Sequence, residues 1–178
     1  DHYAAAYGGM NIITFNPDET VQVDPVINSH HSLKELSDKL LLFFTGYTRN
    51  ASEILKSQIE ATADKFETLK EMRDLVPAMK KNIKDKDHDS FGKLLHKNWL
   101  LKKSITNDIS NSKLDEYYQR ALDSGALGGK LLGAGGGGFL CFYANENVQK
   151  DVRKNLFKLF NTDFSFESAG AQITYYNQ

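Results

Sequence analysis

The sequence predicts an α+β fold, a two-layer structure in which helices cover an antiparallel sheet. Short apolar runs typical of strands open the chain, and a block of helical periodicity occupies its middle. A strand, a helix and a second strand are predicted after that block. Because strands and helices do not alternate regularly, a doubly wound parallel sheet is not expected.

The first two strands are predicted to form a hairpin. Residues 10–15 and 20–26 are rich in β-type side chains, and residues 16–19 (Asn-Pro-Asp-Glu) between them favour a turn. Residues 40–45 (LLLFFT) are short and apolar on both faces, as a buried strand would be.

Four helical segments are predicted next. Asn50 or Ser52 can cap the first. The second covers residues 65–84, and we expect Pro77 to kink or break it. The third covers residues 90–106. Ser112 is predicted to cap the fourth, which ends near Ser124 and Gly125. Strand, helix and strand are then predicted at residues 139–144, 148–160 and 172–176.

Composition excludes several classes of function. The net charge of −1 gives no reason to expect binding to nucleic acid or to an anionic membrane. No run approaches the ~20 apolar residues of a membrane-spanning helix, and we find no signal peptide. The single cysteine, Cys141, lies in an apolar run and is predicted to be a buried thiol, which fits a reducing cytoplasm. His30 and His31 have no ligand partner at metal-binding spacing, so no metal site is predicted.

Residues 128–138 (GGKLLGAGGGG) carry the strongest functional signal, because seven of these eleven residues are glycine. Such a cluster indicates backbone with positive φ, or a close approach of another group to the backbone. Successive exposed N–H groups can form a nest that binds an anion, and phosphate is the expected guest.

Two familiar phosphate-binding motifs do not fit this run. Gly133, Gly135 and Gly138 match G-x-G-x-x-G, but that motif should follow a strand and open a helix, whereas this run is predicted to follow a helix and open a strand. A Walker A loop would need glycine at Ser124 and a hydroxyl residue at Leu131. A glycine hinge, or a tight turn from helix to strand, remains the structural alternative.

The run from Lys130 to Gly138 closely resembles the third conserved motif of the GHMP kinases, a superfamily that includes galactokinase and mevalonate kinase. Residues 1–9 (DHYAAAYGG) resemble the segment D-Q-Y-A-A-A-x-G-G of the branch that phosphorylates heptose 7-phosphate, with His2 in place of Gln. Residues 41–46, the pair Thr48-Arg49 and residues 99–103 resemble the same branch, so the similarity covers nearly the whole chain.

The resemblance implies roles for particular residues. Asp1 corresponds to a carboxylate that orients the acceptor hydroxyl and accepts its proton in a longer parent, whereas in this chain we expect the terminal Asp to be frayed. Gly133, Gly135, Gly136, Gly137 and Lys130 would contact the nucleotide phosphates. Arg49, Tyr3 and Gly8 would contact the substrate. ATP and Mg²⁺ are the implied cofactors.

Several of these residues also have simpler explanations. Arg49 can be a solvated loop arginine, and Lys130 a surface lysine. Lys102 and Lys103 are expected on a solvated face rather than at a substrate phosphate. Trp99 is expected in the core rather than stacked on a sugar.

The family's main nucleotide loop, G-L-G-S-S-S-A, has no counterpart in these 178 residues. We therefore expect residues 1–28 to be the end of the N-terminal kinase domain and residues 29–178 to be the C-terminal domain, with a ferredoxin-like layout. The implied activity is ATP-dependent phosphorylation of heptose 7-phosphate at its anomeric hydroxyl by a longer parent, and this chain alone is expected to be inactive. The alternative is a non-catalytic binding or dimerisation module whose sheet edges pair two copies as a homodimer.

Overall fold

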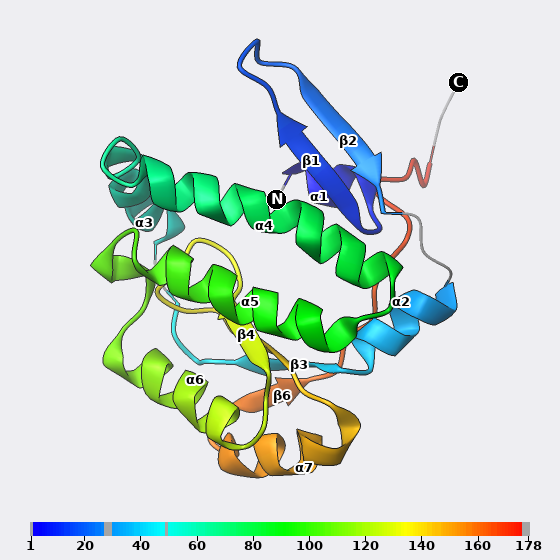
Figure 1. Cartoon of the computed structure of the whole chain (residues 1–178), viewed down its shortest axis with the longest axis vertical. Coiled ribbons are helices and arrows are strands. Elements are labelled where there is room, and N and C mark those ends of the chain that lie inside the picture. The colour runs from blue at the N-terminus through cyan, green and yellow to red at the C-terminus, as the bar shows by residue number, and fades with distance from the viewer. Residues whose placement is uncertain (1, 27–29, 49, 176–178) are drawn as a thin grey trace. The chain divides into compact units, whose positions relative to one another are not determined.

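The structure is a computed structural model that describes residues 2–26, 30–48 and 50–175. The chain divides into two compact units, Asp1–Ser37 with Ser165–Gln178, and Asp38–Phe164 (Figure 1). The expected family domains, residues 1–28 and 29–178, have different limits and stay a prediction. None of the helices in the described ranges is long and apolar enough to cross a membrane.

The larger unit is built from one sheet and its helices. Its strands are β3 (Leu40–Phe44), β4 (Gly128–Leu131), β5 (Phe139–Tyr143) and β6 (Phe160–Thr162). Its helices are α3 (Ala51–Glu60), α4 (Phe66–Lys84), α5 (His88–Lys103), the short 3₁₀ helix η1 (Asn107–Ile109), α6 (Ser112–Asp123) and α7 (Glu146–Asn155).

The strand order in this sheet is β4-β5-β3-β6, and every neighbouring pair is antiparallel. The helices α3 to α6 connect β3 to β4, and α7 connects β5 to β6. This arrangement is the split β-α-β of ferredoxin-like folds. The predicted α+β fold with an antiparallel sheet is therefore confirmed.

One face of the sheet forms the core. Leu41 and Phe43 of β3 lie on that face and are almost fully buried, because alternate residues of a strand share a face. Phe142 of β5 packs against Phe43 and against Tyr118 of α6, which also contacts Trp99 of α5. Trp99 is 1% exposed, so its predicted place in the core is confirmed.

Two predicted helix features need correction. Helix α4 is continuous through Pro77, so the chain does not break there. Proline removes one hydrogen bond within the helix, but Leu75 and Ile83 are buried on either side of it and hold both halves in place. Helix α6 is capped by Asn111 rather than Ser112, since the Asn111 side chain accepts hydrogen bonds from the N–H groups of Lys113 and Leu114. At α3 the predicted cap Asn50 is confirmed.

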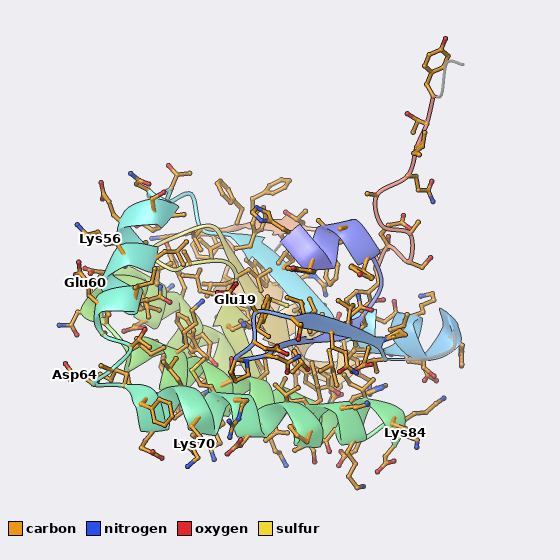
Figure 2. The ribbon with its side chains drawn as sticks, turned by 90° about the horizontal axis from the view of Figure 1, so that it is seen from above. Glu19, Lys56, Glu60, Asp64, Lys70 and Lys84 are labelled. Carbon is orange, nitrogen blue, oxygen red and sulfur yellow. The ribbon has the colours of Figure 1, made fainter. Side chains whose placement is uncertain are left out.

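The outer helices present solvated charges. Lys56 and Glu60 project from α3 and form an i,i+4 ion pair, and Lys84 projects from the end of α4 (Figure 2). Lys84 lies in a run of mixed charges, residues 80–89, which begins in the last turns of α4. Such exposed pairs contribute little to stability.

The smaller unit contains α1 (His2–Tyr7), the hairpin of β1 (Asn11–Phe15) and β2 (Val21–Pro25), and α2 (His30–Ser37). The predicted hairpin is confirmed, with Asp18 accepting hydrogen bonds from the backbone and hydroxyl of Thr20 in its turn. Residues 172–175 form no strand, so the predicted last strand is wrong; the fourth strand of the large sheet is β6 instead.

Candidate functional site: the glycine loop

The glycine run is divided between a strand and a loop. Residues 128–131 form β4, and residues 132–138 connect β4 to β5. As predicted, the run follows a helix, α6, and precedes a strand, β5, but its first four residues form β4, which was not predicted. The loop is the tip of a β-hairpin on one side of the larger unit.

The first two glycines serve packing. A Cβ atom on Gly128 would lie 2.1 Å from the carbonyl oxygen of Gly92 in α5, and one on Gly129 would lie 2.5 Å from that of Cys141. Neither distance is tolerated by a real side chain. Gly128 lets α5 lie directly against the edge strand β4, and Gly129 lets β4 lie closely against β5.

Three side chains hold the carbonyl oxygens of the loop. Lys102 Nζ donates to the carbonyl of Gly133, and Gln58 Nε2 donates to that of Ala134 at 2.9 Å. Thr45 Oγ1 donates to the carbonyl of Gly138 at 2.8 Å. The three side chains come from α5, α3 and the end of β3. Together they bind the loop to three different elements of the larger unit.

Two loop N–H groups are also bound by the protein. Gly136 donates to the carbonyl of Ile109 and Gly138 to that of Tyr47, both at 2.9 Å. Within the described residues, the other loop N–H groups after Leu132 have no partner. They belong to Gly133, Ala134, Gly135 and Gly137.

These N–H groups form a candidate anion cradle. Gly133 and Gly135 have φ of 83° and 133°, which L side chains rarely adopt. Gly133 is exposed, while Gly135 and Gly137 are partly exposed, so a ligand can reach their N–H groups. Carbonyl oxygens bound by side chains and N–H groups without a partner among the described residues give the loop the polarity that binds phosphate oxygens.

Steric contacts explain why the loop cannot carry larger residues. A Cβ on Gly135 would lie 2.8 Å from the Cα of Ile109. A Cβ on Gly137 would lie 2.3 Å from the carbonyl oxygen of Tyr47. The loop is therefore closely packed on both sides, which argues against the alternative of a free glycine hinge.

Two lysines lie at the base of the loop. Burial, and to a smaller extent the charge of Lys130, lowers the pKa of Lys102 to about 8. Burial also lowers the pKa of Lys130. The expectation that Lys102 lies on a solvated face is wrong, because the last turn of α5 places it against the loop. Its neighbour Lys103 instead pairs with Asp115 at 2.7 Å.

For the other predicted site residues, the described part of the structure shows no contact with this loop. Asp1 and Arg49 lie outside the described residues. Tyr3 and Gly8 belong to the smaller unit, where the Tyr3 ring packs edge-on against Phe15. Gly8 has φ of 64°, and a Cβ there would lie 2.4 Å from the backbone of Ala169, so its role in the unit is structural.

No metal site is evident in the ranges that the structure describes, where no three potential ligand side chains converge. His31 lies 3.1 Å from Glu35 in an i,i+4 pair. The Mg²⁺ that the family resemblance implies stays a prediction, because this ion is usually held by one or two carboxylates together with the phosphates of the substrate.

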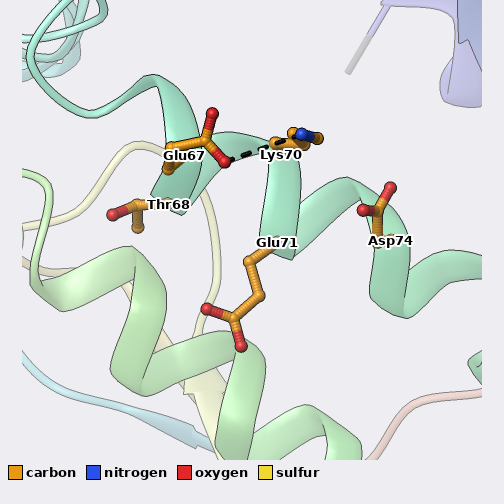
Figure 3. Close-up of a pocket in the computed structure, with 5 residues that line it drawn as sticks. All are labelled: Glu67, Thr68, Lys70, Glu71 and Asp74. Atoms are coloured by element: carbon orange, nitrogen blue, oxygen red, sulfur yellow. Dashed lines mark ion pairs between the residues drawn. The ribbon is translucent and has the colours of Figure 1, made fainter.

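A second hollow, of about 450 Å³, lies along α4 and is lined by Glu67, Thr68, Lys70, Glu71 and Asp74 (Figure 3). Its carboxylates already have cationic partners. Glu67 lies 3.6 Å from Lys70, Glu71 lies 2.7 Å from Lys97, and Asp74 lies 2.7 Å from Arg73. This is a solvated helix face rather than a second site.

Part of the chain matches a known protein family. Residues 79–162 match the family described as GHMP kinases C terminal. The predicted resemblance to this family is therefore confirmed.

A particular relative supports the same conclusion. The D-glycero-alpha-D-manno-heptose 7-phosphate kinase of Campylobacter jejuni is 32% identical over 97% of this chain and 52% of its own length. The chain thus spans about half the length of this relative.

Solved structures agree on the fold. Mevalonate kinase of L. major in complex with R-mevalonate superposes with a TM-score of 0.72 and 20% identity, over 95% of this chain and 52% of that one. A D-glycero-D-manno-heptose 1-phosphate kinase from Bacteroides thetaiotaomicron superposes with a TM-score of 0.66 and 24% identity. This match covers 98% of this chain and 49% of that one. At these identities the likeness establishes the fold alone.

Proposed function

We propose that this chain is the C-terminal part of an ATP-dependent kinase that phosphorylates a sugar phosphate, with heptose 7-phosphate as the substrate and its anomeric hydroxyl as the acceptor. The observation that carries the proposal is the glycine loop, in which three side chains bind carbonyl oxygens while four N–H groups have no partner among the described residues. The similarity to the Campylobacter heptose 7-phosphate kinase supports the choice of substrate.

The loop suits phosphoryl transfer, a reaction that depends on alignment and on stabilising charge on the phosphate oxygens. Bound ATP would supply the phosphoryl group. In our proposal, the free N–H groups of Gly133, Gly135 and Gly137 and the amine of Lys130 bind oxygens of its phosphate chain. Asp1 orients the acceptor hydroxyl and takes its proton, and Arg49 binds the phosphate of the sugar.

We further propose that activity needs additional sequence equivalent to the N-terminal half of the relatives, since the chain covers only 52% of the heptose kinase. That N-terminal half would supply the family's main nucleotide loop, which has no counterpart in these 178 residues. The lone buried Cys141 fits a reducing compartment, and we propose that the protein works in the cytoplasm.

The experiment is a phosphoryl-transfer assay on the chain extended by such an N-terminal half, followed by ³¹P NMR. With ATP and D-glycero-D-manno-heptose 7-phosphate, we expect a new phosphate resonance split by the anomeric proton. Mevalonate serves as the comparison substrate. Phosphorylation of mevalonate, with heptose 7-phosphate unchanged, would refute the proposed substrate.

A second candidate function, a dimerisation module, is favoured by one observation. Strand β6 is at the edge of the four-stranded sheet, and its Phe160 is 71% exposed. An open edge of this kind can pair with a second copy. Light scattering of the chain alone distinguishes this candidate, since it predicts a dimer that Phe160→Lys dissociates.

A further inference from the structure

The end of α1 and a segment near the C-terminus bind each other within the smaller unit. We call this segment, residues 167–171 (ESAGA), the C-terminal strap. The N–H of Gly9 donates to the carbonyl of Glu167 at 2.9 Å. The N–H of Ala171 donates to the carbonyl of Ala6 at 3.0 Å. These two backbone hydrogen bonds join the start of the described chain to its end.

Glycine on both sides makes this close contact possible. A Cβ on Gly170 would lie 2.0 Å from the carbonyl oxygen of Ala6. A Cβ on Gly8 would lie 2.4 Å from the backbone of Ala169, and Gly8 also has φ of 64°, which L side chains rarely adopt. Each segment therefore carries a glycine where the backbone of the other segment passes.

The strap holds the C-terminal end of α1. The carbonyl of Ala6 is among the last four of the helix, which have no partner inside it, and the N–H of Ala171 satisfies it. None of the six residues of α1 is buried, and a helix this short is unstable on its own. On the hairpin side, the Tyr3 ring packs edge-on against Phe15. The strap therefore fixes a helix end that has no buried face to hold it.

We propose that the C-terminal strap positions the acceptor side of the kinase site, with Gly170 as the main positioning residue. The inference rests on the proposed function, in which Asp1 acts on the acceptor hydroxyl. Asp1 directly precedes α1 in the sequence, and the strap binds the other end of that six-residue helix. The glycine loop belongs to the larger unit and is held by its own side chains, so a displaced strap should leave nucleotide binding unchanged.

The first test compares kinetic constants of the chain extended by the N-terminal half, with ATP and D-glycero-D-manno-heptose 7-phosphate. Gly170→Ala forces the strap away from Ala6 and should lower kcat by about tenfold, since misalignment of the acceptor slows the chemical step. The KM for ATP should stay unchanged. Gln172→Ala, at an exposed position just beyond the strap, is the matched control and should retain the wild-type kcat. A KM for ATP that rises as much as kcat falls would contradict a positioning role.

Hydrogen exchange of the 178-residue chain tests the strap without any activity. The amides of Gly9 and Ala171 should be protected in wild type, because both donate across the contact. Ala171→Pro removes the N–H that binds Ala6 and should speed exchange at Gly9. The amide of Thr45, bonded to Gly138 in the larger unit, reports whether a variant is folded. Unprotected amides at both Gly9 and Ala171 in wild type would overturn the proposal.

The outcomes separate this inference from the proposed function. An extended wild-type chain that leaves the sugar phosphate unchanged would refute the proposed function, and the positioning role with it. An active wild type whose Gly170→Ala and Ala171→Pro variants keep the full kcat, although Gly9 exchanges faster, would refute the role of the strap alone. If Gly170→Ala also loses protection at Thr45, Ala171→Pro decides, and the same tenfold fall in kcat is expected of it.

Discussion

The hydroxyl of Thr45 donates a 2.8 Å hydrogen bond to the carbonyl oxygen of Gly138, across 93 residues of sequence. The backbone N–H of Thr45 donates to the same oxygen at 2.9 Å. Thr45 also accepts from the N–H of Tyr47 at 3.3 Å, and the residue is only 6% exposed. The end of strand β3 therefore fixes the end of the glycine loop.

Replacing Thr45 by valine keeps the shape of the side chain and removes its hydroxyl. We expect Thr45→Val to lower the free energy of unfolding by about 1–2 kcal/mol, because the N–H of Tyr47 loses its acceptor in a partly buried site. Urea denaturation measures this change. Thr45→Ser retains the hydroxyl, so its free energy of unfolding should fall clearly less. An equal decrease in both variants would show that packing, and not the hydrogen bonds, is responsible for the change.

Gly137 and Gly133 offer a matched pair of substitutions within the loop. An alanine at Gly137 would place its Cβ 2.3 Å from the carbonyl of Tyr47, whereas an alanine at Gly133 would meet nothing within 4 Å and only has to adopt φ of 83°. We expect Gly137→Ala to destabilise the chain by about 1–3 kcal/mol through overpacking.

Gly133→Ala should cost about 1 kcal/mol, since only its left-handed backbone conformation is unfavourable. Thermal or urea unfolding gives both values. A larger loss at Gly133 than at Gly137 would mean that the loop does not pack on Tyr47 as described.

The stability of the chain should depend on pH through Lys102. The pKa of this amine is about 8 in the folded chain and 10.5 ordinarily, so between these values the unfolded state binds a proton that the folded state does not. The free energy of unfolding should therefore rise as the pH increases through this window.

The comparison must be made between wild type and Lys102→Met, because Cys141 acts in the opposite direction. Burial raises the pKa of its thiol from 9.0 to about 11, which lowers stability as the pH rises above 9.0. Urea unfolding on both sides of pH 8 should show a steeper rise for wild type than for Lys102→Met. Parallel profiles would exclude a titrating Lys102 in this range.

Cys141 should be chemically inert in the native chain. The residue is only 9% exposed, and burial raises the pKa of its thiol to about 11, so little reactive thiolate is present near neutral pH. We expect reaction with a disulfide reagent only at the rate of unfolding, and immediate reaction in urea. Rapid modification of the folded chain would contradict its burial.

Local sequence patterns predicted the strands that carry apolar side chains, and failed where glycine replaced them. β3 and β5 are apolar runs and were found, but β4 begins Gly-Gly-Lys and has little strand propensity. It is a strand because α5 packs against it at a distance that only glycine permits. Contacts between distant segments set this strand, and no short window of sequence contains them.

The candidate site shows the same limit. The glycine run itself was evident from composition, but the side chains that hold its carbonyls were not. Gln58 lies 76 residues from Ala134, and Lys102 lies 31 residues from Gly133. A glutamine or lysine on a helix gives no local sign that it will meet a particular backbone oxygen, so only the fold reveals these residues.

The most direct test of the central claim, that this loop supplies one part of a phosphate site which further kinase sequence completes, is calorimetric titration of the 178-residue chain with Mg-ATP and, in parallel, with D-glycero-D-manno-heptose 7-phosphate. We predict no binding of roughly micromolar strength to either ligand, because the loop and its lysines alone provide few contacts. Micromolar binding of ATP would show that the glycine loop is a self-sufficient site and would contradict the claim.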